Sequence, residues 1–321
     1  MMLPTAKSAR LDARLAIGTS VLTLVLLIAG GLVWSTGSAL ACPDWPLCYG
    51  EVFPVMKGQV LFEHGHRLIA AAVATSTVVL AVRTFADRRL RWLSLAATGL
   101  VLLQAVLGGL TVLLKLPLLV RVLHLATSQA FFAAILILTA RCIQLAAAGN
   151  AAKAVAPVSP PAQRALALAA AAVYLQLLLG ALVRHTGSAL ACRSVLWCDG
   201  QLWPRGFGPG EVQMLHRYWA LVAGALVIWS TLRALPDLER SASPLPRILA
   251  IAAPVLLLTQ IGLGFSSVLS FLSVPVVTAH LAVGALLWGD LVLLWILTSA
   301  PHPLPQPSPQ VERLTAEAAR S

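Results

Sequence analysis

Two pairs of histidines repeat along the chain with fixed spacings. His66 is followed 150 residues later by His216, and His124 is followed 156 residues later by His280. Neutral imidazole is a good axial ligand for heme iron. A single histidine in an apolar helix is often only a hydrogen-bonded packing residue, but four at matched positions are better explained as ligands. The spacing therefore predicts two porphyrin sites, each with one histidine on either face of the ring.

The acidic residue nearest to these histidines occurs in only one copy of the repeat. Glu63 lies one turn before His66, whereas the matching position of the second half holds Gln213. A carboxylate there could accept protons or orient water beside a reacting porphyrin edge. The alternative is an interfacial ion pair with Arg67, four residues further along the same helix face. The asymmetry favours a reactive site in the first half and a holding site in the second.

Three other side chains near the histidines have less specific interpretations. Arg67 and Arg217 either pair with the propionates of a bound heme or simply extend towards the membrane surface. On a helix of 100° per residue, His64 points about 160° away from His66. Its counterpart in the second half is Met214. We therefore expect His64 to pack or to support a neighbouring group rather than to bind iron.

Four cysteines lie in two short loops with the same spacing. The seven-residue string that ends at Cys42 is repeated letter for letter and ends again at Cys192, and Cys48 matches Cys198. These loops are expected on the outer side of a membrane, where disulfides form. The favoured prediction is two disulfides, Cys42–Cys48 and Cys192–Cys198. A redox-active first pair and a four-cysteine metal site joining both loops are the alternatives.

The composition places these residues in a membrane. Of the 321 residues, 59% are hydrophobic and 11% are charged, and the mean hydropathy is +0.85. An ordinary soluble domain is therefore excluded. A helix needs about 20 apolar residues to cross the hydrocarbon. Eight segments qualify, at 15–35, 61–82, 92–114, 119–140, 163–183, 213–232, 247–269 and 274–297.

Basic residues indicate the orientation of these helices. Of the 23 Lys and Arg residues, fifteen lie on the side that holds the N-terminus and eight on the other. Translocated loops are kept poor in Lys and Arg, so both termini are predicted to be cytoplasmic. The net charge of +11 is then a topology signal plus attraction to anionic lipid. No nucleic-acid partner is needed to explain it.

The repeat predicts the domain organisation. Each half has four helices, which predicts an all-α integral membrane protein of two parallel-repeat four-helix bundles. The bundles are expected at 1–145 and 163–298, with a cytoplasmic linker at 146–162 and a disordered cytoplasmic tail at 299–321. A six-residue insertion in the second half is expected in the loop around 233–246. All four histidines then lie about five residues inside the outer surface, or roughly 8 Å at 1.5 Å per residue.

Taken together, these features resemble the heme A synthases of bacterial membranes. The resemblance covers about residues 15–297, and no motif position departs from the family pattern. It rests on the paired cysteines of each half and on Glu63, His66, Arg67, His124, His216 and His280. It implies oxidation of a methyl substituent of heme O to the formyl group of heme A, for use in cytochrome oxidases.

The resemblance also implies roles for individual residues. In the family, the C-terminal half holds a b-type heme through the residues that match His216 and His280. The N-terminal half receives heme O near His66 and His124, with Arg67 as a further heme contact. The implied partners are heme O, heme A, the farnesyltransferase that makes heme O and an unidentified electron donor. The implied location is the cell membrane, with the hemes towards the outer side.

The implied chemistry leaves two routes open. A methyl group carries no acidic proton, so its oxidation needs an oxidant. This is either oxygen activated at a heme or electron removal from the porphyrin followed by addition of water, with the second heme relaying electrons. Two successive hydroxylations give a geminal diol, which loses water to become the aldehyde. The alternative functions are a quinol-linked membrane cytochrome b, which would not need the Glu63 and Gln213 difference, and a heme carrier.

Overall fold

The structure, a computed structural model, is built from long helices. It describes residues 6–147, 155, 157–194, 197–198, 200–204, 206 and 208–299. In these ranges there is no strand apart from two single-residue bridges, and one short 3₁₀ helix spans Ser188–Leu190. The long helices are α1 (Ala6–Ser35), α2 (Gly58–Thr84), α3 (Arg88–Leu113), α4 (Leu118–Ala146), α5 (Pro160–His185), α6 (Pro209–Leu238), α7 (Leu245–Leu269) and α8 (Val274–Leu297).

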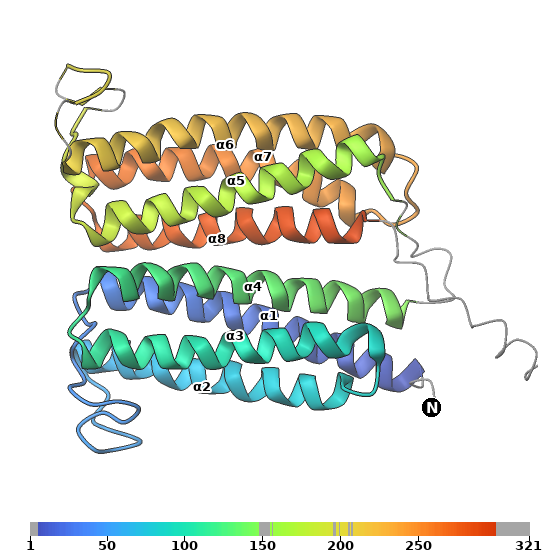
Figure 1. Ribbon diagram of the computed structural model, residues 1–321, viewed down its shortest axis with the longest axis horizontal. Helices are drawn as coiled ribbons and strands as arrows, with labels where there is room; N and C mark the ends of the chain where they lie inside the picture. Colours follow the sequence, from blue (N-terminus) through green and yellow to red (C-terminus); the bar gives the residue numbers. More distant parts are fainter. Residues whose placement is uncertain are drawn as a thin grey trace, which may run out of the picture.

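The helices run side by side along one axis in two groups (Figure 1). In the first group α1, α2, α3 and α4 form a closed ring in which each helix packs on the next and α4 returns to α1; α5 to α8 form a second ring. Between the groups, α8 packs on α1 and α4, and α5 packs on α4. All eight helices are long and apolar enough to cross a membrane. The prediction of an all-helical chain with eight spans is confirmed.

A small residue allows close packing between the two groups. A Cβ added at Gly289 of α8 would lie 3.0 Å from side-chain atoms of Phe132 and Leu136 on α4. One position further back, Trp288 donates its indole N–H to the carbonyl of Gln129 at 3.1 Å. Small residues and side-chain hydrogen bonds at helix crossings are what hold helices together in lipid. They fix α8 against the first group.

The helices extend beyond the predicted apolar segments. α1 begins at Ala6 rather than at 15, and α6 ends at Leu238 rather than at 232. Hydropathy marks the span inside the hydrocarbon, whereas backbone hydrogen bonds continue into the charged ends, where Arg83 donates to Asp12 at 2.6 Å. The loop predicted at 233–246 is therefore wrong in part, because residues 233–238 are helical and absorb some of the insertion.

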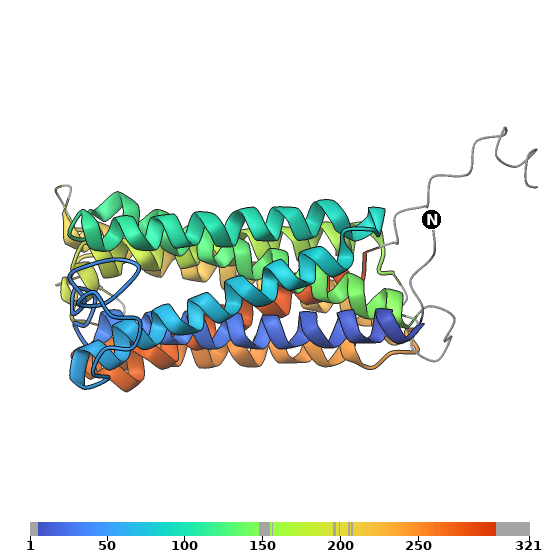
Figure 2. The same cartoon turned by 90° about the horizontal axis from the view of Figure 1, so that it is seen from below.

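Both cysteine loops lie at the same end of the molecule, opposite the N-terminus (Figures 1 and 2). The first connects α1 to α2 and the second connects α5 to α6. Each contains one antiparallel bridge, between Cys48 and Glu51 and between Cys198 and Gln201. The loops therefore share a local fold as well as a sequence.

Residues 148–154 and 156 of the predicted linker and the predicted tail from residue 300 lie outside the described residues. The described end of the linker leads into α5, which begins at Pro160, a residue tolerated in the first turn because its missing N–H would have no helical partner. The N–H of Val158 donates to the carbonyl of Thr298 at 3.1 Å. The N–H of Ser159 donates to the Asp237 carboxylate at 2.9 Å. The start of α5 is thus tied to the ends of α6 and α8.

Candidate functional site

A cavity of about 530 Å³ lies within the α1–α4 group at the end that carries the cysteine loops. Its walls are mostly apolar side chains of these four helices, and the loop after α1 adds Trp45, Pro46 and Leu47. The loop packs tightly, because a Cβ added at Gly109 of α3 would lie only 2.9 Å from the Trp45 ring. The loop therefore covers the cavity at the end of the helix group opposite the N-terminus (Figure 1).

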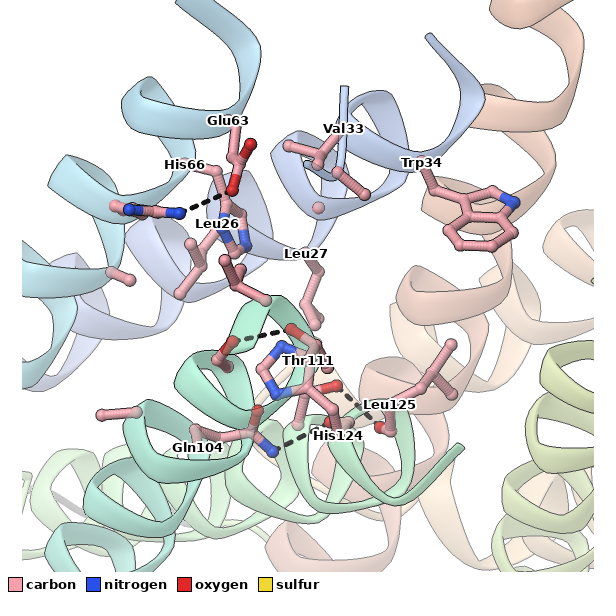
Figure 3. Close-up of a pocket in the computed structure, with 18 of the residues that line it drawn as sticks. Leu26, Leu27, Val33, Trp34, Glu63, His66, Gln104, Thr111, His124 and Leu125 are labelled. Carbon is pink, nitrogen blue, oxygen red and sulfur yellow. Dashed lines mark hydrogen bonds and ion pairs between the residues drawn. The ribbon is translucent and has the colours of Figure 1, made fainter. Parts of the chain in front are cut away.

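The first histidine pair lines this cavity from two different helices, His66 from α2 and His124 from α4. Figure 3 shows both imidazoles facing the same open space. A Cβ at Gly30 of α1 would lie 3.2 Å from Nε2 of His66, and one at Gly108 of α3 would lie 3.5 Å from Cε1 of His124. Gln104 donates to the backbone carbonyl of His124 at 2.9 Å. The structure thus brings together the two side chains that the repeat paired.

The second histidine pair has the same setting in the α5–α8 group. A Cβ at Gly180 would lie 3.1 Å from Cε1 of His216, and one at Gly264 would lie 3.2 Å from Cε1 of His280. Nδ1 of His280 lies 3.1 Å from the carbonyl of Gln260. Because a carbonyl can only accept, this nitrogen carries the proton, which leaves Nε2 as the unprotonated nitrogen; it lies 3.5 Å from the side-chain nitrogen of Gln260 and is the one that could bind a metal.

A glycine opposite each histidine is a feature that sequence reasoning did not use. Gly30 and Gly180 differ by 150 residues, and Gly108 and Gly264 differ by 156, the same offsets as the histidines they face. Neither pair entered the predictions from the sequence. The available signal was a glycine repeated inside an apolar helix, where glycine lowers helix stability and needs a packing reason.

Glu63 is a buried carboxylate whose two oxygens both accept hydrogen bonds. It is 4% exposed. One oxygen accepts the backbone N–H of Cys42 at 2.8 Å, and the other accepts from Arg67 at 2.6 Å. The residue also lines the cavity, on the same helix as His66. The interfacial ion pair considered from the sequence is present, but it lies at the cavity wall rather than away from it.

Gln213 makes the equivalent contact in the second half. Its side-chain oxygen accepts the backbone N–H of Cys192 at 2.6 Å, and its nitrogen donates to the carbonyl of Ala189 at 2.8 Å. Both residues thus anchor the first cysteine of a loop. Glu63 alone adds a negative charge to that anchor.

The repeated arginines hold the same loops by their carbonyl groups. Arg67 donates to the carbonyls of Asp44, at 2.7 Å, and of Leu47. Arg217 donates to the carbonyl of Cys192 at 2.8 Å. Arg67 also lines the cavity, but its described hydrogen bonds go to Glu63 and to the loop. The geometry therefore favours a loop-holding role over the alternatives of propionate pairing and simple extension to the surface.

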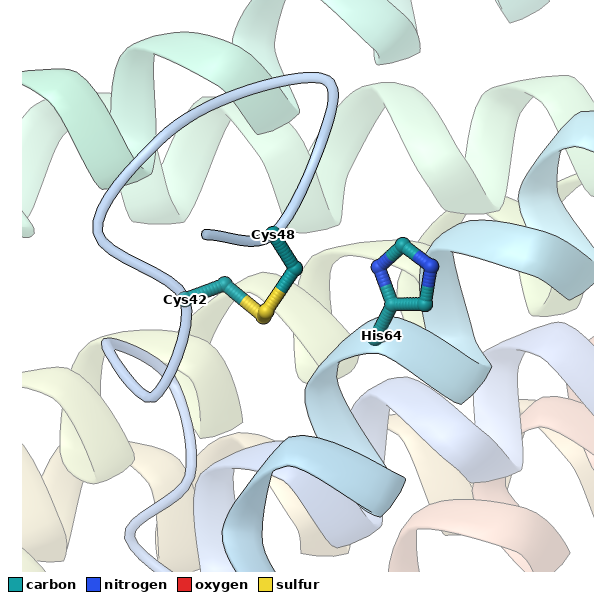
Figure 4. A group of neighbouring side chains, drawn as sticks. All are labelled: Cys42, Cys48 and His64. Atoms are coloured by element: carbon teal, nitrogen blue, oxygen red, sulfur yellow. A yellow bond between two sulfur atoms is a disulfide. The ribbon is translucent and has the colours of Figure 1, made fainter. Parts of the chain in front are cut away.

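The four loop cysteines form two disulfides, Cys42–Cys48 and Cys192–Cys198, as predicted. With every sulfur of these loops in a disulfide, a metal site joining both loops is not formed. His64 lies beside the first disulfide (Figure 4). Nε2 of its buried ring lies 2.8 Å from the carbonyl of Val52 in the same loop. His64 thus packs under the loop, as expected from the sequence, and it also contributes to the lining of the cavity.

Asp44 shapes the tip of the first loop. Its carboxylate accepts the backbone N–H groups of Gly50 at 2.8 Å and Tyr49 at 2.7 Å. The hydrogen bond from Gly50, followed by that from Tyr49, lowers the pKa of Asp44 below its usual value. A lowered pKa means that the stabilisation is present above the ordinary pKa of Asp and is lost as the pH falls through the lowered one. The ionised Asp44 carboxylate therefore stabilises the turn at the loop tip at neutral and mildly acidic pH.

The arrangement fits a flat, largely apolar ligand that carries a metal. Two imidazoles from different helices face one apolar cavity, as required for binding iron from both sides of a porphyrin. A carboxylate one turn from His66 could exchange protons with the edge of such a ligand. The described part of the second group offers a histidine pair but a neutral amide at the equivalent of Glu63.

Known proteins similar to this chain match most of its length. The COX15-CtaA family, described as cytochrome oxidase assembly protein, matches residues 13–292. A heme A synthase of Shouchella clausii is 31% identical over 79% of this chain and 85% of the relative. Heme A synthases of Symbiobacterium thermophilum and Bacillus pumilus are 32% and 34% identical, over 86% and 67% of this chain and 92% and 71% of the relatives.

The anchor at Cys42 predicts how easily the first disulfide is reduced. Glu63→Ala removes the acceptor of the Cys42 N–H, so the loop should open more often and the Cys42–Cys48 bond should be reduced about tenfold faster. Glu63→Gln keeps an acceptor, as Gln213 does, and should stay within about threefold of the unsubstituted protein. Timed reduction in membranes followed by maleimide labelling and peptide mass analysis measures this.

The second disulfide is the control within each sample. Labelling of Cys192 and Cys198 should not change in either variant, because Gln213 still anchors that loop. Equal reduction rates of the first disulfide in all three proteins would show that Glu63 does not hold the loop.

Proposed function

The chain belongs to the COX15-CtaA family of cytochrome oxidase assembly proteins, and we propose that it oxidises a methyl substituent of heme O to the formyl group of heme A. Heme A synthase is the activity of its relatives. The observation that carries the proposal for this chain is the cavity of the α1–α4 group, where His66 and His124 face one apolar space with Glu63 at its wall.

Heme O is the substrate assigned to this cavity. His66 and His124 bind its iron from the two faces of the ring, and apolar side chains of α1 to α4 surround the porphyrin. Trp45, packed on Gly109, excludes water from the outer side. A cavity with apolar walls and few polar groups orients a hydrophobic ligand and strengthens each polar contact inside it.

The α5–α8 group is assigned to heme b as a resident cofactor, held by His216 and His280. This assignment is supported by the hydrogen bond from His280 to Gln260, which leaves the second ring nitrogen for iron. Gly180 and Gly264 let both rings lie directly against helix backbones. When bound, heme b supplies a one-electron relay to the reacting site.

Glu63 is the proton acceptor in this proposal. Its carboxylate reaches the cavity wall while Arg67 and the Cys42 N–H fix its orientation. In the route by electron removal and addition of water, each two-electron oxidation of the methyl carbon releases protons, and a positioned carboxylate takes up a proton. Arg67 acts by holding the carboxylate and the loop that covers the cavity, and His64 acts by supporting that loop.

The two halves are assigned as parallel repeats, 1–145 for substrate and 163–298 for heme b, joined by 146–162. Equivalent contacts at Glu63 and Gln213, at Arg67 and Arg217 and at the four glycine–histidine pairs support the repeat. The excess of basic residues at the N-terminal side supports cytoplasmic termini in the cell membrane, with the hemes towards the outer side. The proposed partners are heme O synthase, which supplies the substrate, and a separate electron donor.

Removal of either ligand in the second half should remove heme b. His216→Ala and His280→Ala each take away one residue that would hold the heme, and the only other histidine in the described part of α5–α8, His185, lines the cavity of the α1–α4 group. The purified variants should lack the low-spin heme b spectrum in a pyridine hemochrome assay, whereas His66→Ala should retain it. A normal heme b spectrum in both variants would contradict the assignment.

A matched pair of glycines on α7 tests whether the histidine needs its glycine neighbour. Gly264→Val should displace the His280 ring, because a Cβ there already lies 3.2 Å from it, and heme b content should fall severalfold. Gly262→Val is the control, since a Cβ at Gly262 meets nothing within 4 Å. Optical spectra normalised to protein measure both. Equal losses in the two variants would point to a general helix effect.

The carboxylate of Glu63 should be needed for product formation but not for folding. Glu63→Gln keeps the loop anchor and removes the proton acceptor, so heme A output should fall by roughly 10²-fold or more, with heme O or a partly oxidised product accumulating. Chromatography of hemes extracted after co-expression with a heme O-producing farnesyltransferase measures this. Gln213→Glu should not raise output. Near-normal heme A from Glu63→Gln would reduce Glu63 to a structural partner of Arg67.

A further inference from the structure

Three cationic or titratable side chains gather around one tryptophan at the side of the cavity that faces the second group. Arg121 lies in the first turn of α4, and Arg184 and His185 are the last two residues of α5. All three line the cavity, together with Trp34 near the end of α1. Figure 3 shows Trp34 across the open space from His66. We call Arg121, Arg184 and His185 the outer cationic cluster.

The cluster is held in place by the tryptophan and by backbone carbonyls. The guanidinium carbons of Arg121 and Arg184 lie 4.9 and 5.7 Å from the Trp34 ring centre, and the His185 ring meets it edge-on at 4.7 Å. Arg184 donates to the carbonyl of Gly31 at 2.9 Å, and Arg121 donates to that of His185 at 3.3 Å. These contacts hold both guanidinium groups in place, but they do not occupy all of the N–H donors.

Several polar atoms of the cluster remain available. Nε of Arg121 and Nδ1 of His185 are buried and have no hydrogen-bond partner. Among the residues that the structure describes, neither arginine forms an ion pair with a carboxylate. Burying two guanidinium groups without a counter-charge in the wall of a cavity within the membrane costs free energy. An anionic ligand in the cavity would offset that cost.

The cluster, like Glu63, is not duplicated between the two halves. The position that matches Arg121 in the second half is Val277, and Arg184 itself stands where the first half has Trp34. Arg184 and His185 belong to α5, yet they line the cavity of the α1–α4 group. Both arginines without a carboxylate partner therefore lie at the cavity that is assigned to the substrate.

We propose that the outer cationic cluster binds the two propionate carboxylates of the porphyrin substrate. The proposal rests on the function assigned to the cavity. Arg121 precedes His124 by three residues, so it lies about 4.5 Å further out along α4, on a neighbouring face. Both propionates leave the same edge of a porphyrin, and guanidinium groups bind carboxylates through charge-assisted hydrogen bonds.

This contact would also determine which substituent reacts. The methyl group that becomes the formyl group shares its pyrrole ring with one of the propionates. Fixing both propionates at the cluster therefore fixes the rotation of the ring about its iron, which the two histidines alone leave free. Arg121 and Arg184 are positioning residues in this proposal, because they act on the orientation of the substrate and not on the bond that changes.

The test uses two probes that differ only in the carboxylates, ferric protoheme and its dimethyl ester. The purified protein with its retained heme is titrated with each probe, and binding is followed by Soret difference spectra. The unsubstituted protein should bind protoheme about tenfold or more tighter than the ester. Arg121→Gln and Arg184→Gln should each weaken protoheme binding about tenfold and leave ester binding within about twofold. Arg184→Lys should restore part of the difference.

Arg193→Gln is the matched control for loss of positive charge, because Arg193 is exposed in the second cysteine loop and does not line the cavity. It should change neither affinity. Equal binding of both probes by the unsubstituted protein would overturn the proposal. The cluster would then either bind anionic lipid head groups or only pack on Trp34. Equal weakening of both probes in the arginine variants would overturn it as well.

A different result would identify failure of the cavity assignment itself. If the unsubstituted protein binds neither probe, or if His66→Ala and His124→Ala bind both probes as tightly as it does, the substrate is not in this cavity. The proposal for the cluster then falls with the function on which it rests.

Discussion

The contact of an imidazole ring with a glycine of the neighbouring helix is the interaction on which the rest of the molecule depends. In lipid, helices associate by close packing and by hydrogen bonds rather than by the hydrophobic effect. A glycine removes the side chain that would otherwise fill the ring's position, as at Gly30 beside His66 and at Gly264 beside His280. Four such contacts give each histidine ring room against a neighbouring helix, and at the first pair both rings line a cavity.

The two halves share these glycine–histidine contacts, and a few residue differences make them chemically different. Glu63 and Gln213 anchor equivalent cysteine loops through the same backbone N–H. The charge of Glu63 is therefore not needed for the anchor, and its presence in one half demands another explanation. Arg121 and Arg184 line the same cavity as Glu63, and the matching positions of the other half hold Val277 and Trp34. An electron-transfer cytochrome with two equivalent hemes would need neither difference.

Features that depend on a local sequence pattern could be predicted from the sequence. Long apolar segments predicted eight spans, and matched spacings predicted both the histidine pairs and the disulfides. Helix ends were less predictable, because hydropathy does not detect charged turns such as those of Asp12 and Arg83. The contribution of Arg184 to the first cavity could not be predicted at all. It depends on how α5 packs against α4, and no spacing within either half encodes the contact between them.

The structural and reactive interpretations of Glu63 are compatible. A carboxylate has about four lone-pair positions, and the bonds from Cys42 and Arg67 use one on each oxygen. Each oxygen therefore keeps a position that can accept a further hydrogen bond or a proton from the cavity. Gln213 has no such capacity, because its amide nitrogen only donates and its oxygen takes up no proton near neutral pH. In the proposed function, the ion pair with Arg67 orients the proton acceptor, and the same carboxylate holds the loop that covers the cavity.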